Sequence, residues 1–406
     1  MMNDSGRTEA RLQSTVSKMI AGVLARRDEL IEALTEAATY ESAADEVQRS
    51  VRVLAGAPWE ISRNTPRELE QVTSFLPSNN ILYSYTLFGL IPSLFTRQVI
   101  ARSSARVRPV TEKVHRILAD LTGGRVALTA ASQREFVRLC AVSDAVVFTG
   151  QPQNAAQVMA AVGTGPRVLA FGSGPNPFVI GPEADVRTAA EDLLAARLYN
   201  SGQDCLCPDV AFIHSSIVDE VTAYLCDTVE GLTVGDRRDP ATRVAPIVYE
   251  DAVQHAAQYL VDNRAYVVRG GGVDTATGVV EPTVLRMPWC DGFEPPEFFS
   301  PVFCIMSYDD AHKLGRWFTS PAERERGMYT SVYGEPDLPY DKIGTTVVCH
   351  GRTIFDIEDG NKPFGGFGPH AGCVQVDGKI TGRPLLLSAE MRAEQVPAAA
   401  GLRQLR

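Results

Sequence analysis

Short apolar runs alternate with helical stretches over most of this chain, and this alternation restricts the fold more than any other feature. Stretches with apolar residues at helical spacing lie at 154–162 and 186–199. The apolar runs cover residues 125–128, 145–148, 167–171, 210–213 and 345–349. Strands separated by helices typically form a parallel sheet with helices packed on its faces. From residue 65 onward the sequence therefore predicts an α/β fold.

The N-terminal region has a different pattern. Between residues 15 and 38, apolar side chains recur at steps of three and four, the spacing of an amphipathic helix. A second helical stretch covers 42–55, and Gly56-Ala57-Pro58 is expected to end it, because proline interrupts a helix interior. We therefore predict N-terminal helices ahead of the α/β part.

The composition is that of an ordinary folded protein. Apolar residues make up 45% and charged residues 22% of the 406 residues, which excludes a disordered chain, a collagen-like repeat and a coiled-coil rod. The 49 acidic and 39 basic residues give a net charge of −10, which argues against a broad nucleic-acid surface. At roughly 150 residues per domain, the length suggests two or three domains.

Neither a membrane segment nor a disulfide framework is expected. No apolar run approaches the ~18 residues of a spanning helix, and the first residues lack the pattern of a signal peptide. The eight cysteines are widely scattered, and only Cys205 and Cys207 are close in sequence, without a second pair to complete a zinc site. We predict reduced thiols, no bound metal and a cytoplasmic location.

The segment Asn200-Ser201-Gly202-Gln203-Asp204-Cys205 is the strongest candidate for a catalytic site. A helical pattern ends near residue 199 and an apolar run begins after Pro208, so Cys205 is expected in a loop between helix and strand. A single cysteine is more often a small buried apolar residue. The polar, turn-forming neighbours of Cys205 weaken that alternative.

This segment resembles the G-Q-x-C nucleophile motif of the aldehyde dehydrogenase superfamily. Further motifs of that superfamily follow in the same order, and together they extend over about residues 76–385. They are Phe148-Thr149-Gly150 (F-T-G), Asn176-Pro177-Phe178-Val179-Ile180 with Ala184-Asp185 (the stretch after E-L-G-G), Glu297-Phe298-Phe299-Ser300-Pro301-Val302 (E-x-F-G-P-V), 328–333 (G-L-T-A-S-V-F) and Pro363-Phe364-Gly365-Gly366 (P-F-G-G). The resemblance implies an aldehyde dehydrogenase-like fold with a Rossmann-type cofactor domain and an α/β catalytic domain.

The resemblance also implies the catalytic residues. Cys205 would be the nucleophile that attacks a carbonyl carbon. Asn80 corresponds to the asparagine whose side-chain amide helps to hold the oxyanion, where a preorganised donor stabilises the developing charge. Asn79-Asn80 could instead be only a turn.

For the cofactor, the resemblance places Glu297 on the ribose of the nicotinamide and Phe299 beside the nicotinamide ring. The alternative for these two residues is a loop acid and a core aromatic. Gly150 and Gln151 begin the turn into the cofactor helix, where a phosphate can face the helix N-terminus. The later glycine of this motif is missing.

Arg102 corresponds to the family's lysine that contacts the adenosine ribose. With Arg106 and Arg108 it would suit a 2′-phosphate, so NADP is slightly favoured over NAD. A solvated basic strand edge explains the three arginines equally well.

The most informative departure from the family is Ala170. It stands where the E-L-G-G motif has the glutamate that activates water against the thioacyl enzyme, and alanine cannot accept a proton. Family members that exchange their acyl group with CoA also lack this glutamate. We therefore favour an acyl-thioester reductase or acylating aldehyde dehydrogenase, with CoA or a carrier arm as the thiol. A hydrolytic enzyme with a substitute base and a catalytically silent scaffold are the alternatives.

The expected organisation has three parts. Residues 1–171 would form the N-terminal helices and the nicotinamide-cofactor domain, and 172–375 the catalytic domain. Residues 376–406 would form a C-terminal strand or tail that could serve in oligomerisation. The expected partners are a small aldehyde or acyl thioester, CoA or a carrier protein, and a second copy in a homodimer or higher homo-oligomer, with no nucleic acid and no membrane.

Overall fold

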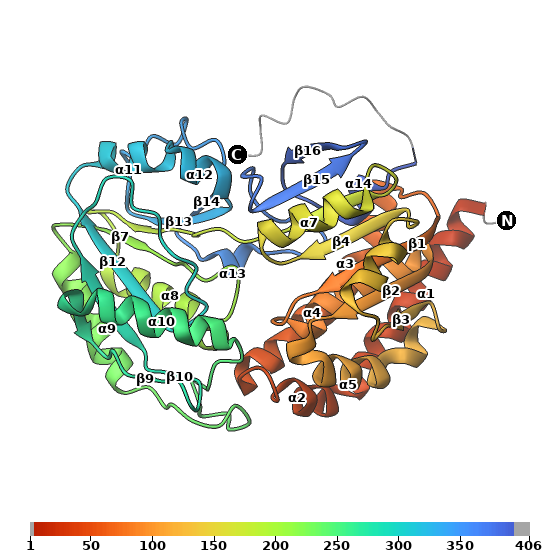
Figure 1. The fold of residues 1–406 in the computed structure, drawn as a ribbon, viewed down its shortest axis with the longest axis horizontal. Coiled ribbons are helices and arrows are strands. Elements are labelled where there is room, and N and C mark those ends of the chain that lie inside the picture. The colour runs from red at the N-terminus through yellow and green to blue at the C-terminus, as the bar shows by residue number, and fades with distance from the viewer. Residues whose placement is uncertain (1–3, 394–406) are drawn as a thin grey trace.

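In the computed structural model, which describes residues 4–393, two seven-stranded sheets lie side by side and form the frame of the molecule (Figure 1). The chain passes from the first sheet to the second after β5 (Arg167–Phe171) and returns after β14 (Val347–His350). The α/β fold class, with a Rossmann-type sheet and a second α/β unit, is confirmed.

The first sheet has five parallel strands and a C-terminal hairpin at one edge. Its order is β16-β15-β5-β4-β1-β2-β3, and β15 runs antiparallel to both of its neighbours. The remaining strands are β1 (Leu69–Leu76), β2 (Thr96–Ser103), β3 (Val126–Leu128), β4 (Ala145–Thr149), β15 (Gly372–Val376) and β16 (Lys379–Gly382). Apolar side chains on both faces of these strands are buried, as is usual for a parallel sheet.

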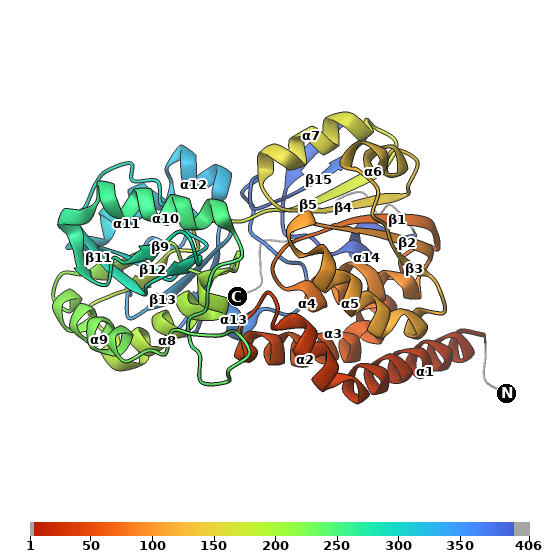
Figure 2. The ribbon, with the colours of Figure 1, turned by 60° about the horizontal axis from the view of Figure 1, so that its bottom comes forward.

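Helices cover both faces of the first sheet (Figure 2). On one face lie α6 (Gln133–Cys140) and α7 (Pro152–Val162). On the other face lie the N-terminal helices and the two that follow β1 and β2. These are α1 (Asp4–Ala25), α2 (Arg27–Leu34), α3 (Tyr40–Asn64), α4 (Ile81–Tyr85) and α5 (Arg108–Leu118).

The second sheet has the order β14-β13-β6-β7-β12-β11-β8, with only β8 antiparallel. Its strands are β6 (Phe178–Ile180), β7 (Ala211–His214), β8 (Val267–Arg269), β11 (Thr283–Met287), β12 (Val302–Tyr308), β13 (Tyr329–Tyr333) and β14. Alternate residues of β12 pack against α8 (Val186–Leu198) and α9 (Val218–Glu230) on one face, and against α10 (Glu250–Asp262) and α11 (Ala311–Phe318) on the other.

Shorter elements complete the described part of the chain. The strands β9 (Val273–Asp274) and β10 (Val279–Val280) form a small ribbon, and α12 (Pro321–Arg326), α13 (Ile354–Ile357) and α14 (Leu387–Glu390) are short helices. The single-turn segments are η1 (Thr86–Leu90), η2 (Pro92–Leu94), η3 (Ala105–Val107), η4 (Ala119–Thr122), η5 (Tyr199–Gly202) and η6 (Arg264–Tyr266).

The apolar runs in the sequence all form strands, namely β3, β4, β5, β7 and β14. The two helical stretches between them form α7 and α8. The helix expected over 15–38 is divided, because α1 ends at Ala25 and α2 ends at Leu34. Residues 35–38 form turns instead.

The helix end expected at Gly56-Ala57-Pro58 is wrong, because α3 continues to Asn64 with Pro58 inside it. Pro58 has no N–H to donate to the preceding turn. The carbonyl that this N–H would bind is that of Leu54, four residues earlier. Asn361 stabilises the same turn, since its Nδ2 donates to the adjacent Val53 O at 3.0 Å. Gly56 makes room for this amide, because a Cβ on Gly56 would lie 2.0 Å from Asn361 Oδ1. A residue far away in the sequence thus supports the helix across the proline.

The two crossings between the sheets lie against each other. The N–H of Gly172 donates to Ala371 O at 3.0 Å. A Cβ on Gly172 would lie only 1.9 Å from His370 O, so this contact requires glycine. The crossings bring the loops of both sheets around one space, which is where the candidate site lies.

The C-terminal hairpin of β15 and β16 belongs to the first sheet through its pairing with β5. The part expected from residue 376 onward therefore begins inside this hairpin. Its role in oligomerisation stays a prediction, and residues 394–406 lie outside the described part of the chain.

Replacing Asn361 with alanine should lower the free energy of unfolding by about 2–4 kcal/mol. The change removes the donor to Val53 O and a 2.9 Å hydrogen bond to the buried carboxylate of Glu60, and each buried group left unpaired costs roughly 1–3 kcal/mol. Equilibrium unfolding in urea measures the effect. The exposed neighbour Lys362→Ala is the control and should stay within ~0.5 kcal/mol. An equally small effect of Asn361→Ala would show that α3 passes Pro58 without this support.

Candidate active site

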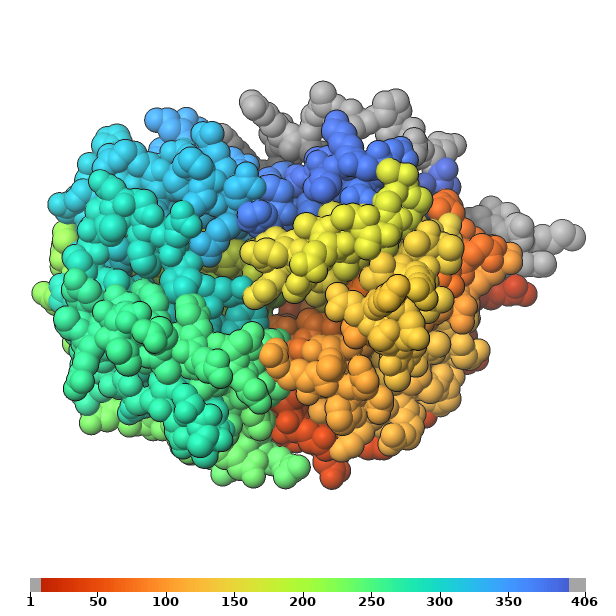
Figure 3. All heavy atoms as spheres, in the orientation of Figure 1, coloured from red at the N-terminus to blue at the C-terminus, as the bar shows by residue number. Residues whose placement is uncertain are grey.

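A central cavity of about 610 Å³ lies between the two sheets, and the surface is hollowed at this place (Figure 3). Its walls come from the loops of both sheets and from α3. Most of the site residues expected from the sequence border it. These are Asn80, Gly150, Gln151, Cys205, Glu297 and Phe299. Arg102 does not border it.

The loop that carries Cys205 follows α8 directly and has an unusual backbone. Asn200, Ser201 and Gly202 all have positive φ values, and the two non-glycine residues are buried. The strain is balanced by specific contacts, since Asn200 Oδ1 accepts from the N–H of Thr39 at 3.2 Å. The start of α3 therefore holds the loop in the conformation that presents the thiol to the cavity.

Arg197 joins the loop of Cys205 to the loop of Glu297. Its side chain is completely buried and forms an ion pair with Asp209 at 2.9 Å. The same guanidinium donates to Ser300 O at 2.5 Å. The two loops are thus held at a fixed separation by one cation that does not border the cavity.

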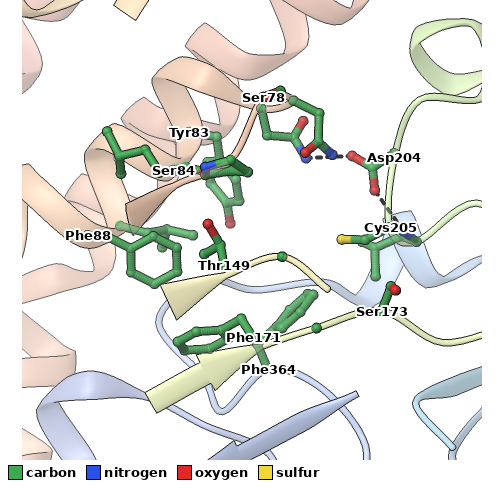
Figure 4. A pocket seen from close by; sticks show the side chains of 18 of the residues that line it. Ser78, Tyr83, Ser84, Phe88, Thr149, Phe171, Ser173, Asp204, Cys205 and Phe364 are labelled. Atoms are coloured by element: carbon green, nitrogen blue, oxygen red, sulfur yellow. Dashed lines mark hydrogen bonds between the residues drawn. The ribbon is translucent and has the colours of Figure 1, made fainter. Parts of the chain in front are cut away.

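The thiol of Cys205 borders the cavity, and its sulfur is directed into it (Figure 4). Its pKa is raised well above the ordinary value because protein encloses the thiol, and because Asp204 and Glu297 place negative charge nearby. Arg49 acts in the opposite direction and favours the thiolate. Burial and these two acids therefore favour the neutral thiol over the thiolate.

Asp204 connects the cysteine loop to Asn80. One carboxylate oxygen accepts from Asn80 Nδ2 at 2.5 Å, and the other accepts from the N–H of Leu206 at 2.8 Å (Figure 4). Burial raises the pKa of Asp204. One N–H of the Asn80 amide is bound by this carboxylate, which fixes the amide and leaves its second N–H to donate to a ligand.

The backbone around Asn80 is fixed from the N-terminal helices. Asn80 has a left-handed φ of 49° at the start of α4. Glu46, in α3, accepts from the N–H groups of Leu82 and Tyr83 at 2.9 and 3.3 Å. A buried carboxylate thus accepts hydrogen bonds from N–H groups at the start of α4 that have no partner within the helix. Burial raises the pKa of Glu46 to about 7.

A second buried ion pair lies on the cavity wall. Arg49 of α3 donates to Glu358 at 2.5 Å, and the hydroxyl of Tyr83 donates to the same carboxylate at 2.7 Å. The guanidinium also lies over the ring of Tyr83, 4.2 Å from its centroid. This cluster places the positive charge of Arg49 near the cysteine loop.

Another part of the cavity wall has polar groups suited to phosphates and hydroxyls. Gly150, with a φ of 142°, turns the chain from β4 into α7, and Gln151 at the N-cap of α7 borders the cavity. A helix N-terminus attracts anions. Glu297 forms a hydrogen bond with Ser173, and burial raises the pKa of its carboxyl group. The ring of Phe299 lies 5.2 Å from that of Tyr249.

The arginines after β2 lie in different places. Arg102 Nε donates to Ala131 O at 3.0 Å, away from the cavity. Arg106 borders the cavity, pairs with Asp251 at 2.8 Å and lies over the ring of Tyr249 at 4.7 Å. The guanidinium on the cavity wall is therefore that of Arg106.

Ala170 is buried in the apolar core under α6 and α7 and does not border the cavity. The next two side chains toward the site that do border it are Phe171 and Ser173. None of these three side chains carries a carboxylate. The acids on the cavity wall come from other segments, and they are Glu60, Asp204, Asp251, Glu297 and Glu358.

Three residues of the cavity wall that influence Cys205 or Asn80 were given no role by sequence reasoning. They are Asp204, Arg49 and Glu358. Asp204 stands at the variable position of the G-Q-x-C motif. Its place directly before Cys205 is the one signal in the sequence that could have identified it. Arg49 and Glu358 are 309 positions apart and form their pair only in the fold. No local pattern distinguishes either residue from an ordinary surface charge.

Residues 4–393 contain neither a candidate metal site nor a helix suited to span a membrane. No group of three or more histidine, cysteine or acidic side chains there could hold a metal ion. Nor does any helix in the same range have the length and apolar character needed to cross a membrane.

Comparison with known proteins gives a consistent result. Residues 120–367 match the family model described as "Aldehyde dehydrogenase family". A succinate-semialdehyde dehydrogenase [NADP(+)] of Saccharomyces cerevisiae is 29% identical over 244 residues, which cover 53% of this chain and 49% of that protein. The betaine aldehyde dehydrogenase of Sinorhizobium fredii is 26% identical over 204 residues, 48% of this chain and 41% of that protein. The chain spans about half the length of the curated relatives that it matches.

Solved structures are similar over nearly the whole chain. A succinic semialdehyde dehydrogenase from Streptococcus pyogenes in complex with NADP+ has a TM-score of 0.80 at 16% identity and covers 94% of this chain and 90% of its own. A glyceraldehyde-3-phosphate dehydrogenase from Methanocaldococcus jannaschii in complex with NADP has the same TM-score and identity, with 94% and 88% covered. At this identity the similarity concerns the fold.

Replacing Asp204 with asparagine should accelerate alkylation of Cys205 by iodoacetamide about 3–10-fold at mildly alkaline pH, because loss of one nearby negative charge lowers the pKa of the thiol. Asparagine keeps an acceptor for the Leu206 N–H. Mass spectrometry of the peptide containing Cys205 measures the rate. Asp251→Asn removes the same charge from the far end of the cavity and is the matched control. Equal rates in the two variants would contradict a specific effect of Asp204.

Proposed function

Because this chain belongs to the aldehyde dehydrogenase family, we propose that it interconverts an aldehyde and an acyl group attached to Cys205, with NADP or NAD as hydride carrier. Assembly into a homodimer or larger homo-oligomer is part of the proposal. The observation that carries it is the central cavity, where Cys205, Asn80 and Glu297 meet from three separate segments.

A second group of residues on the cavity wall fits a nicotinamide dinucleotide. Gln151 at the N-terminus of α7 and the guanidinium of Arg106 suit phosphate groups, and the carboxylate of Glu297 suits a ribose hydroxyl. NADP is favoured because Arg106 adds a cation on this wall. The name of the Saccharomyces cerevisiae relative also specifies NADP(+).

The chemistry follows from the groups around the thiol. The sulfur of Cys205 bonds to the carbonyl carbon as the π bond of the carbonyl breaks. Because the pKa of this thiol is raised, its proton leaves as the bond forms and ends on the carbonyl oxygen, which gives a neutral thiohemiacetal. The free N–H of Asn80 donates to the carbonyl oxygen as it becomes negative. Asp204 keeps the amide in place for this bond. When bound, the nicotinamide exchanges a hydride with the carbon attached to sulfur.

A second part of the proposal concerns how the acyl group leaves. No carboxylate occupies the end of β5, where Ala170 is buried in the core and Phe171 borders the cavity. Glu297 is bound to Ser173, and both oxygens of Asp204 accept hydrogen bonds. We therefore propose that a thiol such as CoA or a carrier arm, rather than water, accepts or donates the acyl group.

Replacing Arg106 with alanine should remove most of the preference for NADPH over NADH, a loss of about tenfold or more in relative affinity, because charge-assisted hydrogen bonds contribute roughly 1.5–3 kcal/mol. Isothermal titration calorimetry with both reduced cofactors measures the preference. Arg102→Ala is the matched control, since Arg102 already donates to Ala131 O. A larger loss in the control would assign the 2′-phosphate to Arg102 instead.

With an aldehyde and oxidised cofactor but no added thiol, the enzyme should release a burst of about one reduced nicotinamide per active site and then turn over slowly. A positioned base contributes ~10²–10⁴-fold to the attack of water, so the acyl group should remain on Cys205 without one. Rapid-quench measurement of reduced cofactor, with intact-protein mass spectrometry for the acyl adduct, tests this. Addition of CoA or pantetheine should restore steady turnover.

The other outcomes distinguish the alternatives. Fast steady turnover without a thiol would favour hydrolysis with a substitute base. Asp204 and Glu297 would then be the first residues to replace by mutation. Absence of both a burst and cofactor binding would favour a catalytically silent scaffold. Cys205→Ala is the control, and it should abolish the burst and the adduct together.

A further inference from the structure

We infer that the aldehyde or acyl chain accepted by this site is neutral and apolar, either aliphatic or aromatic, and that it lies in an apolar limb of the central cavity. This inference rests on the proposed function, because it concerns the group attached to the reacting carbon. The apolar limb consists of Phe88, Ile91, Phe95, Phe171, Phe364 and Leu385, which all border the same cavity as Cys205.

The walls of the apolar limb come from three separate parts of the chain. Phe88 lies in η1, directly after α4, and Phe171 ends β5 of the first sheet. Phe364 lies in the return crossing between β14 and β15. The rings of Phe88 and Phe171 lie 5.1 Å apart, and those of Phe171 and Phe364 lie 6.2 Å apart. Figure 4 shows these three rings grouped on one side of the cavity and the Cys205 sulfur directed into it.

Little of this apolar surface is open to bulk solvent. Phe88 and Phe171 are each 8% exposed and Ile91 is 3% exposed, although all three border a cavity. A cavity with such walls gains free energy when an apolar group fills it, in proportion to the area removed from water. A polar chain would lose its hydration there without gaining hydrogen bonds.

The charge of Arg49, the cation on the cavity wall that acts on Cys205, is already neutralised by acids of this chain. Arg49 is paired with Glu358 at 2.5 Å and with the ring of Tyr83. Its Nη1 faces Asp45 at 4.0 Å, and Asp45 borders a different hollow on the outer side of α3. Two acids therefore already surround this guanidinium.

The other cations on the cavity wall are engaged elsewhere. Among the residues that border the cavity these are Arg106 and Lys362. Arg106 is paired with Asp251 at the cofactor end. Lys362 is paired with Asp359 at 3.0 Å, and 63% of its side chain is exposed. A chain that ends in a carboxylate would also meet the acids Glu60, Asp204 and Glu358, so we expect it to be disfavoured.

The test compares butanal, hexanal, octanal and phenylacetaldehyde with succinate semialdehyde, in the presence of CoA and oxidised cofactor. We expect kcat/KM to rise about three- to fourfold for each added CH2 until the limb is filled. We also expect octanal to exceed succinate semialdehyde by at least about 100-fold. Equal or greater kcat/KM for succinate semialdehyde would overturn the inference and leave the proposed function intact.

A binding experiment separates this inference from the proposed function, because it needs neither turnover nor cofactor. Octanamide, an inert and neutral analogue, should slow the alkylation of Cys205 by iodoacetamide, and succinamate at the same concentration should not. Protection by octanamide in a protein without turnover would support the limb and count against the proposed activity. Equal protection by both compounds would overturn the inference.

Phe364→Ser places a hydroxyl in the limb and should lower the ratio of octanal to butanal kcat/KM about tenfold. Phe367→Ser is the matched control, because Phe367 is 48% exposed and does not border the cavity; its ratio should not change. If Phe364→Ser fails to fold in a thermal melt, Phe364→Leu replaces it and should lower the ratio of phenylacetaldehyde to butanal instead. The same ratios in control and limb variants would contradict the assignment.

Discussion

The buried ion pair of Arg197 and Asp209 fixes the geometry on which the site depends. A guanidinium without water needs acceptors for its donors, and here they are one carboxylate and the backbone carbonyls of the two loops that carry Cys205 and Glu297. Removing either partner would leave an unpaired buried charge at a cost of roughly 3–5 kcal/mol. The separation of Cys205 and Glu297 is therefore set by a contact that neither residue makes.

The fold could be predicted from the sequence wherever local pattern and tertiary environment agree. The apolar runs of β3, β4, β5, β7 and β14 are buried strands, and the pattern shows this because parallel strands need apolar residues on both faces. The end of α3 could not be predicted. Pro58 is a local signal for a helix end, but α3 continues through it. The turn before Pro58 is stabilised by Asn361, which no sequence window around Pro58 contains.

The same distinction applies to the candidate site. Cys205, Asn80 and Glu297 lie in motifs whose spacing survives in the chain, and they meet in the cavity. Arg102 was selected because it corresponds to the family's lysine that contacts the adenosine ribose, and because the alternating Arg102, Arg106 and Arg108 would suit a 2′-phosphate. The strand ends at Ser103 and the η3 turn follows, so the alternation stops and Arg106 alone of the three reaches the cavity.

The pair of Arg49 and Glu358 affects two properties, the stability of the fold and the pKa of Cys205. Two charges that are almost completely buried lose favourable hydration free energy, and their mutual attraction compensates for only part of this loss. Replacing such pairs with apolar residues of equal volume is often neutral or stabilises the fold by about 1–4 kcal/mol. Yet Arg49 is the charge that opposes the raised pKa of Cys205. Replacing both charges together by apolar side chains of equal volume would therefore leave the free energy of unfolding unchanged or higher, and would make the Cys205 thiol ionise less readily.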